Sequence, residues 1–316
     1  MKNQRLFIKL MEDYNKIIES LNVRFISAKN INILQPLTIE NYYDVENVVL
    51  FVHKGEVRFG KDKQVVNENE ILFIPGGKMV SITYGKGAAT SLSNDDFINN
   101  REKFFQNADK IVAKSENDNV SFINFDAKVF DTVNFFASLD IPPFVIKNNN
   151  KLISIVKEVV SEMYSGFAGK GRVVKLETDH LVVEIIRHIL NKGLFVEQFA
   201  TNSTYFKDPR LIDIFAYIKK NLNEDLSNKI LADVANVSED YVGQYFKMLT
   251  GINPQDYIEY QRMEMAVNML RTSKKSIREI GKEVGYKDTA YFCRRFKMMF
   301  GIPAGKMRRR ETLMNV

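Results

Sequence analysis

A seven-residue segment occurs twice in the last third of this chain, and this duplication constrains the fold more than any other feature. Residues 246–252 read Phe-Lys-Met-Leu-Thr-Gly-Ile, and residues 296–302 read Phe-Lys-Met-Met-Phe-Gly-Ile, an offset of 50 residues. A solenoid needs at least about three repeats to bury a continuous core. Two copies therefore indicate a duplicated supersecondary unit.

The similarity extends upstream of both copies. Ala232 is followed four residues later by Asn236, and Gly281 is followed four residues later by Gly285. A small side chain lets two helices cross closely, and Asn or Gly tolerates the left-handed backbone that ends a helix. Each copy therefore has the pattern of a helix-turn-helix.

A helix-capping residue follows each turn, Ser238 in the first copy and Asp288 in the second. Their side-chain oxygens can accept hydrogen bonds from the free N–H groups at a helix N-terminus. The apolar spacing that follows predicts helices over 239–249 and 289–300, and a further helix over 255–271 would join the two motifs. The residues that we assign to the core of the motifs are Phe246, Ile280, Tyr286, Tyr291, Phe292 and Phe296.

This doubled pattern resembles the DNA-binding domain of AraC-type transcription regulators over roughly residues 209–310. The most specific matches lie in the second half, at Ile280-Gly281, Gly285-Tyr286, Tyr291-Phe292, Arg295-Phe296-Lys297 and Gly301-Ile302-Pro303. One helix-turn-helix pattern is a weak signal, but two at this separation are specific. The resemblance implies sequence-specific binding to double-stranded DNA, RNA polymerase as a second partner, and activation as the commoner mode of regulation.

The resemblance also implies roles for individual side chains on the two predicted recognition helices. Such helices enter the major groove with their first turns toward the base edges, where Gln pairs with adenine and Arg with guanine. The expected base contacts are Asp240 and Gln244 in the first helix, and Thr289, Ala290, Cys293 and Arg294 in the second. The expected phosphate contacts are Lys247, Lys287 and Lys297.

The positive charge of the chain is concentrated in this region. The net charge is +6, and residues 201–316 hold 20 basic and 14 acidic residues, so they account for all of it. Residues 271–310 hold 13 basic and 3 acidic residues, whereas 208–270 hold 6 and 10. Basic surfaces attract phosphates. Gly243, where the family has a larger polar residue, offers no side chain for reading bases. We therefore expect the second motif to anchor the protein and the first to tune specificity weakly.

Two other interpretations of this charge stay open. The basic residues of the second motif can form an ordinary solvated face. The run of three arginines at 308–310 can add phosphate contacts or be a frayed solvated tail.

Residues 23–125 have the sequence pattern of a β-rich domain. Short apolar runs at 48–52, 57–59, 70–74 and 79–84 alternate with Gly-containing turns, which predicts a small barrel or sandwich. The order of Lys54-Gly55-Glu56-Val57 and then the 71–77 segment Ile-Leu-Phe-Ile-Pro-Gly-Gly resembles a cupin barrel. The expected fold class is α+β: a cupin-like barrel with a helical pair, followed by an all-α double helix-turn-helix domain.

Cupin enzymes hold a divalent metal through closely spaced His residues and a Glu. His53 stands alone here, and Lys78-Met79-Val80 follows Pro-Gly-Gly where a cupin often has a metal His. We therefore predict no metal, no cofactor and no enzymatic activity, and we expect His53 to lie at a strand end with a hydrogen-bond partner. A cupin enzyme is the less favoured alternative.

The barrel interior can still bind a small-molecule effector, because such sites are apolar pockets with a few polar groups. The aromatic candidates for lining one are Phe25, Phe51, Phe59, Phe73 and Tyr84, and the alternative is that they fill the core. A regulator without an effector, controlled by a partner protein, is the other possibility.

Residues 140–200 have helical spacing. One helix is predicted from 152 to about 167 and a second from 173 to 190, separated by Gly169-Lys170-Gly171. The pair resembles the dimerisation element of the family, which implies a homodimer; the alternative is packing on its own barrel. His180 and His188 are too far apart to be paired metal ligands, and we expect them to be ordinary, partly exposed residues.

The predicted organisation is a sensing and dimerisation domain at 1–200, a polar linker at 201–208 and a DNA-binding domain at 209–316. Residues 1–22 are predicted to form an amphipathic helix rather than a secretory signal. No run approaches the roughly 18 apolar residues of a membrane span, and Cys293 is the only cysteine. A cytoplasmic protein without membrane association is therefore expected.

Overall fold

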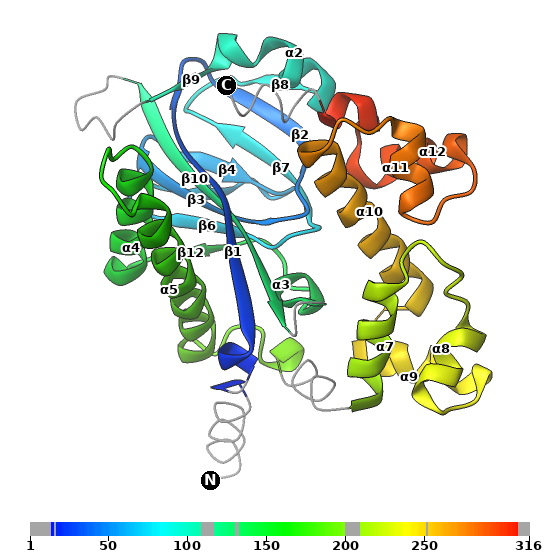
Figure 1. The fold of residues 1–316 in the computed structure, drawn as a ribbon. Coiled ribbons are helices and arrows are strands. Elements are labelled where there is room, and N and C mark those ends of the chain that lie inside the picture. Colours follow the sequence, from blue (N-terminus) through cyan, green and yellow to red (C-terminus); the bar gives the residue numbers. More distant parts are fainter. Residues whose placement is uncertain are drawn as a thin grey trace. The chain divides into compact units, whose positions relative to one another are not determined.

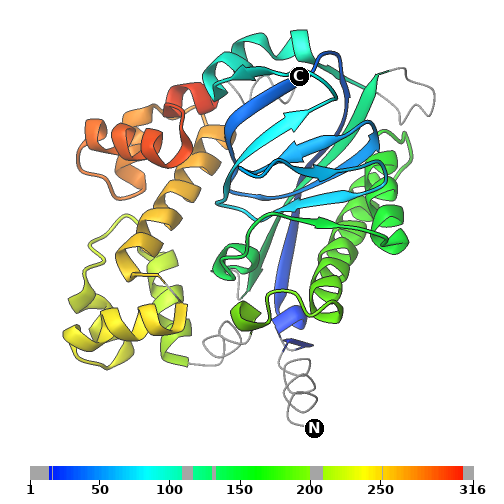
Figure 2. The same cartoon turned by 180° about the vertical axis from the view of Figure 1, so that it is seen from behind.

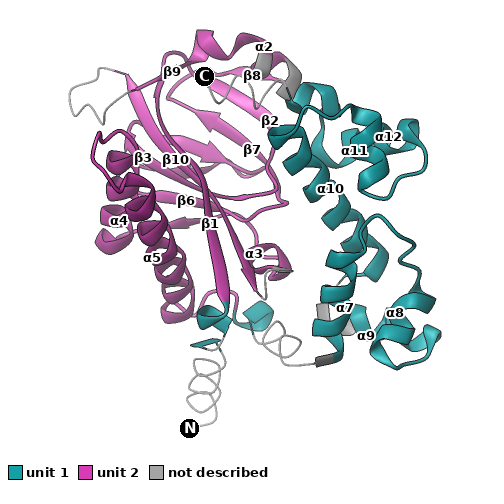
Figure 3. Ribbon diagram, in the orientation of Figure 1, with its two compact units in different colours: residues 1–20, 130–133, 196–316 teal, residues 21–129, 134–195 magenta. Residues whose placement is uncertain are grey.

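The computed structural model describes residues 14–108 apart from 16, and residues 117–129, 133–199, 209–250 and 252–308. The chain divides into two compact units (Figure 3). The β-rich unit comprises 21–129 and 134–195, and the helical unit comprises 196–316 with the segments 1–20 and 130–133. The predicted linker at 201–208 and most of the predicted N-terminal helix lie outside the described residues.

Two sheets form the β-rich unit and give it a cupin-like barrel architecture (Figures 1 and 2). The larger sheet has the order β12 (Phe144–Ile146), β6 (Ile71–Ile74), β3 (Asn47–Lys54), β10 (Asp118–Val129), β1 (Leu21–Ile33) and β9 (Phe105–Asn107), with β11 (Val133–Asn134) beside β10. The smaller sheet has the order β5 (Gln64–Val66), β4 (Val57–Phe59), β7 (Met79–Tyr84), β2 (Leu37–Tyr43) and β8 (Thr90–Leu92). The predicted apolar runs are confirmed as strands.

Side-chain alternation along β3 decides which of its side chains point into the barrel. Val48, Leu50 and Val52 belong to a cluster of buried apolar residues between the sheets, whereas Val49 and Phe51 point to the opposite face. The same two-residue period places Leu72 and Ile74 of β6 inside. The run 48–52 is thus apolar throughout because both faces of β3 are covered.

Helix α2 (Asn94–Phe104) lies within the stretch that we predicted to be strands only, and this part of the prediction is wrong. Ser93 caps it by accepting a hydrogen bond from the Asp96 backbone N–H at 3.2 Å. Phe97 and Phe104 pack into the barrel cluster. In the sequence, the capping Ser93 and the two aromatic residues Phe97 and Phe104 are the signals that distinguish this helix from a polar loop.

The predicted helix pair is confirmed as α4 (Asn150–Met163) and α5 (Lys170–Asn191), which lie side by side on one face of the larger sheet (Figures 1 and 2). Helix α5 begins three residues earlier than expected, because Gly169 adopts a φ of +87° and turns the chain directly into it. The short helix α3 (Phe135–Ser138) precedes β12.

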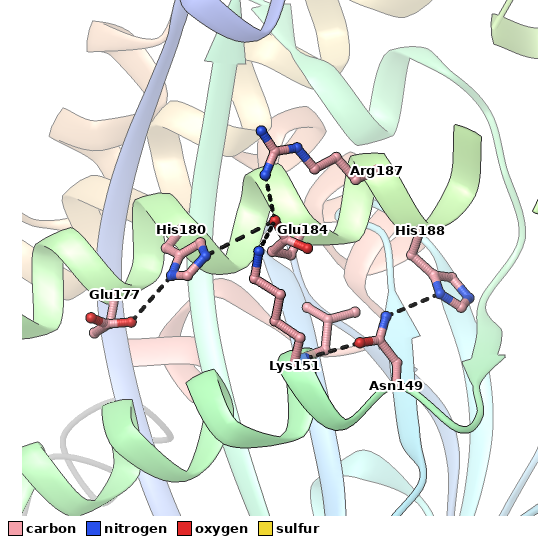
Figure 4. A network of polar contacts seen from close by, with 8 residues as sticks. Asn149, Lys151, Glu177, His180, Glu184, Arg187 and His188 are labelled. Carbon is pink, nitrogen blue, oxygen red and sulfur yellow. Dashed lines mark hydrogen bonds and ion pairs between the residues drawn. The ribbon is translucent and has the colours of Figure 1, made fainter. Parts of the chain in front are cut away.

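A polar network ties α4 to α5 (Figure 4). The nearly buried Glu184 accepts hydrogen bonds from Lys151 Nζ at 2.8 Å and Arg187 Nη1 at 2.6 Å. The exposed His180 lies 4.0 Å from the same carboxylate, and the half-buried His188 pairs through Nδ1 with the Asn149 amide at 3.2 Å. Both histidines are therefore partly exposed parts of the helix pair, as expected.

His53 has the expected place at the end of β3 and the expected partner. Its Nε2 lies 2.7 Å from Ser121 Oγ, which is in turn 3.3 Å from Asn30 Oδ1. Burial, with the nearby Lys157 ammonium, lowers the pKa of His53 from 6.5 to about 4. The folded state therefore favours the neutral imidazole.

This environment predicts that the β-rich unit loses stability in mild acid. His53 takes up a proton near pH 6.5 in the unfolded chain and only near pH 4 in the folded chain. The contribution of neutral His53 to the free energy of unfolding is therefore complete above pH 6.5. It is lost as pH falls from 6.5 to 4, and amounts to up to about 3 kcal/mol. Urea unfolding of wild type and His53→Gln across this range checks it. His180→Gln is the control, and a wild-type profile that His53→Gln does not flatten would contradict the assignment.

The helical unit contains α7 (Pro209–Lys220), α8 (Asn228–Ala235), α9 (Glu239–Thr250), α10 (Pro254–Thr272), α11 (Ile277–Glu283) and α12 (Thr289–Phe300). Helices α8 and α9 form one helix-turn-helix, α11 and α12 form another, and α10 joins them. The three helices predicted from the duplication are confirmed, each to within one residue at either end.

Candidate nucleic-acid interface

Both turns have the left-handed backbone that the repeat predicted. Asn236 ends α8 with a φ of +52°, and Gly285 follows α11 with a φ of +89°. The Asp288 carboxylate then accepts a hydrogen bond from the Tyr291 N–H and caps α12. The Ser238 carbonyl accepts from the N–H groups of the first turn of α9. These local signals set the orientation of each recognition helix against the helix before it.

The small residues at 232 and 281 lie where the helices cross. A Cβ added to Gly281 would come within 3.1 Å of the Phe292 ring, so α11 and α12 approach closely at this point. Ala232 is buried at the matching position of the first motif. Phe246, Ile280, Phe292 and Phe296 are fully buried and Tyr286 is buried, as predicted.

The assignment of Tyr291 to the core is wrong, because 48 % of its surface is exposed. Phe292 and Phe296 are four residues apart and define the buried stripe of α12, and Tyr291 lies about 100° around the helix from Phe292. Tyr241, at the equivalent position of α9, is 43 % exposed. The offset of 50 residues relates the two tyrosines, and with the helical register it could have shown that both face outward.

The predicted contact residues of α9 share its exposed face. Asp240, Gln244 and Lys247 are exposed together with Tyr241, and Gly243 is half-buried among them. The structure thus gathers one acid, one amide and one amine on this helix. Helix α9 carries Glu239 and Asp240 in its first turn and Lys247 in its last turn, so it has no excess of positive charge.

The predicted contact residues of α12 and its approach are also accessible. Ala290, Arg294 and Lys297 are exposed, Thr289 and Cys293 are half-buried, and Lys287 is exposed just before the helix. The guanidinium of Arg294 lies 5.9 Å from the centroid of the Tyr291 ring. A cation–π contact at an exposed site is worth about 0.5–1 kcal/mol, so Arg294 is partly ordered before it meets any ligand.

Two further arginines of the second motif are engaged within the protein. Arg295 forms a two-pronged ion pair with Glu259 of α10, in which its Nε lies 2.5 Å from Oε1. Arg308 donates to the backbone carbonyl of Lys275. Residues 309 and 310 of the arginine run lie outside the described residues. Arg295 entered the sequence analysis as part of the family pattern and as a positive charge, and its partner Glu259 was not identified because it is 36 residues away.

The aromatic candidates of the β-rich unit do not share one surface. Phe59 and Tyr84 belong to the cluster inside the barrel. Phe51 lies on the opposite face of the larger sheet, 5.5 Å from Lys157 of α4, and Phe73 packs there against Phe136 of α3 at 4.8 Å. Phe25 is half-buried on β1. A pocket inside the barrel would therefore use Phe59 and Tyr84.

The described part of the chain contains no group of three or more His, Cys, Asp or Glu side chains placed to hold a metal ion. None of the described helices is both long enough and apolar enough to cross a membrane.

Comparison with known proteins matches residues 231–310 to the helix-turn-helix domain family. An HTH-type transcriptional regulator of Haemophilus influenzae is 26% identical over 159 residues, which are 50% of this chain and 52% of that protein. The MmsAB operon regulatory protein of Pseudomonas aeruginosa is 30% identical over 97 residues, 31% of this chain and 32% of that protein. The chain thus spans about half or less of the curated relatives that it matches.

Among solved structures, ToxT from Vibrio cholerae has a similar fold over nearly the whole chain. The TM-score is 0.53 at 13% sequence identity, covering 93% of this chain and 99% of ToxT. A ToxT structure with an unsaturated fatty acid bound gives a TM-score of 0.50 at 10% identity, covering 92% and 95%. The shared fold confirms the two-part architecture of a cupin-like barrel followed by two helix-turn-helix motifs.

Proposed function

We propose that this protein is a sequence-specific transcription regulator of the AraC type that reads adjacent major grooves with α9 and α12, because residues 231–310 match the helix-turn-helix domain family and the chain shares its fold with ToxT. The observation that carries the proposal is the pair of recognition helices, each with an exposed polar face at the same register of a duplicated motif. Helices presented in this way place their first turns against base edges.

Selection of bound genomic DNA fragments by the full-length protein, at two salt concentrations, tests this proposal. We expect enrichment of a motif with two half-sites about one helical turn apart, roughly 10 base pairs. A single enriched half-site would mean that the second motif alone reads sequence. Salt-sensitive binding without any motif would refute sequence-specific regulation.

Arg294 is the side chain to which we assign the strongest base contact, a bidentate pair with guanine. It is exposed on α12 and partly ordered by the Tyr291 ring. Arg294→Ala should therefore cost roughly 1–3 kcal/mol of binding free energy and relax the preference at one base position. Binding to a library of single-base operator variants measures both effects. Equal losses on every sequence would make Arg294 a phosphate contact instead.

We further propose that a small molecule bound by the β-rich unit controls DNA binding. ToxT supports this part, because it has the same fold and has been solved with an unsaturated fatty acid bound. Phe59 and Tyr84 are the candidates for lining a site within the barrel. Control by a protein partner is the second candidate, and it is favoured by the buried apolar side chains that already occupy the space between the sheets.

Homodimerisation through α4 and α5 is the next part of the proposal. Exposed apolar side chains lie on this helix pair and its turn: Phe167 is 78 % exposed and Leu176 is 50 % exposed. A dimer would raise the affinity for DNA by increasing the effective concentration of the second copy. Activation through RNA polymerase and a cytoplasmic location complete the proposed role.

Leu176→Glu should weaken self-association about tenfold or more, because it places a charge within the proposed apolar contact. Sedimentation of the full-length protein over a concentration series measures the change. Val65→Glu introduces the same charge at another exposed apolar residue of the β-rich unit and should leave association unaltered. A wild-type protein that is monomeric throughout would contradict dimerisation.

A further inference from the structure

Helix α10 holds the first helix-turn-helix through an aromatic contact near its start. The ring of Tyr257 lies 5.0 Å from Phe215 of α7 and 5.6 Å from Phe246 of α9. All three rings are buried. The first recognition helix is therefore packed against the N-terminal part of α10.

Arg262, about one and a half turns further along α10, binds the turn that leads into the same motif. Its Nε donates to the Leu222 carbonyl at 2.9 Å, and its Nη2 donates to the Glu224 carbonyl at 2.8 Å. Both carbonyls belong to the turn between α7 and α8. The planar guanidinium can hold two carbonyls at once, which a lysine ammonium with its single nitrogen cannot do in the same geometry.

The same guanidinium contacts the second motif. It lies 5.9 Å from the centroid of the Tyr286 ring. A Cβ built on Gly285 would be 2.5 Å from the Leu222 carbonyl oxygen and 2.8 Å from Arg262 Cζ. The backbone of the second motif therefore meets the turn that leads into the first motif, and only glycine leaves room for the contact.

Glu259 extends these contacts to the second recognition helix. Its carboxylate accepts hydrogen bonds from Arg295 of α12 and, at 3.4 Å, from the Tyr286 hydroxyl. Hydrogen bonds and one cation–ring contact thus link the turn before the first motif to the second recognition helix, through Arg262, Tyr286, Glu259 and Arg295. We call this set of contacts the interlock.

We propose that the interlock fixes the relative position of α9 and α12, and that Arg262 is the positioning residue that makes the protein selective for the spacing between its two half-sites. This inference rests on the proposed function. Two readers that are rigidly joined engage only operators whose half-sites match their separation. Two loosely joined readers tolerate a displaced half-site, at the expense of affinity for the matched one.

Arg262→Lys tests this inference, because it keeps the positive charge and removes the two-carbonyl contact. Binding is measured to the operator selected by the wild type and to versions with one or two base pairs inserted between half-sites. Each inserted pair rotates one half-site by roughly 34–36°. The wild type should lose roughly 10- to 100-fold in affinity on insertion, equivalent to losing one or two base contacts. The variant should lose several-fold less.

The control is Asn268→Ala, at an exposed position of α10 away from the interlock, and it should keep the wild-type penalty. A mere loss of folded protein would lower binding to all operators equally and leave the ratio between them unchanged. An unchanged ratio in Arg262→Lys, with the second variant Glu259→Gln behaving likewise, would overturn the role of the interlock.

A measurement without DNA separates this inference from the proposed function. Spin labels at residues 229 and 282, on exposed lysines of α8 and α11 in a Cys293→Ser background, report the distance between the motifs by double electron–electron resonance. The distribution should be narrow in the parent and broader in Arg262→Lys. Equal distributions would refute the interlock, even if specific DNA binding is demonstrated. Broadening without any specific DNA binding would refute the proposed function alone.

Discussion

Replacing Lys247, Lys287 and Lys297 together by alanine should reduce affinity for DNA by roughly 100-fold at 0.15 M salt. All three are exposed on or beside the recognition helices. Each phosphate contact releases condensed counterions and contributes about 0.9 to the slope of log affinity against log salt concentration. The triple variant should therefore lose about 2.7 from that slope, while the order of preference among sequences is preserved. Binding titrations at four or more salt concentrations measure both quantities.

A matched triple substitution separates contact from net charge. Lys61, Lys86 and Lys103 are exposed lysines of the β-rich unit, and their replacement by alanine removes the same three charges. That control should keep the wild-type slope. If both triples lower affinity alike with unchanged slopes, the three lysines do not contact phosphates, and the basic residues are a solvated face.

Gly285→Ala should destabilise the helical unit by about 2–4 kcal/mol. The φ of +89° at this position is one that a residue with a Cβ adopts only under strain. The added carbon would also overlap the Leu222 carbonyl and the Arg262 guanidinium, and a backbone atom cannot move aside cheaply. Hydrogen exchange measured on peptides from 277–308 of the full-length protein should show the loss directly.

Gly243→Ala is the matched control, and its effect should have the opposite sign. Gly243 lies within α9, has ordinary helical backbone, and an added Cβ would meet only Asn228 Nδ2 at 3.4 Å. Alanine is favoured over glycine inside a helix by up to about 1 kcal/mol. Equal losses at the two positions would show that glycine at 285 serves no contact between the motifs.

Local chemistry explains why the sequence alone predicted so much of the helical unit. Turns that need positive φ are restricted to a few residue types, so Asn236 and Gly285 mark helix ends. Capping needs a short side chain with an acceptor, so Asp288 marks a helix start. The duplication doubles each signal. The exposed face of α12 followed from the same spacing, apart from Tyr291, where aromatic character was given more weight than helical register.

The β-rich unit was predictable only in part, because period-2 alternation does not say which face of a strand lies inward. Phe51 and Phe73 looked equivalent to Phe59 and Tyr84 in the sequence. Phe59 and Tyr84 point into the barrel. Phe51 and Phe73 point outward, where helices α3 and α4 cover the outer face of the larger sheet. Helix α2 was missed for a related reason. Its two buried aromatic residues, Phe97 and Phe104, pack against the barrel, and the sequence does not show that contact.

The sequence by itself determined the two helix-turn-helix motifs, the recognition helices and the side chains on them, because each depends on residues within a few positions of one another. Only the tertiary structure decided which charges are available and how the motifs are joined. Arg295 meets Glu259 and Arg262 meets Leu222, pairs separated by 36 and 40 residues. Such contacts form only when α10 brings both motifs together, and no local pattern records them.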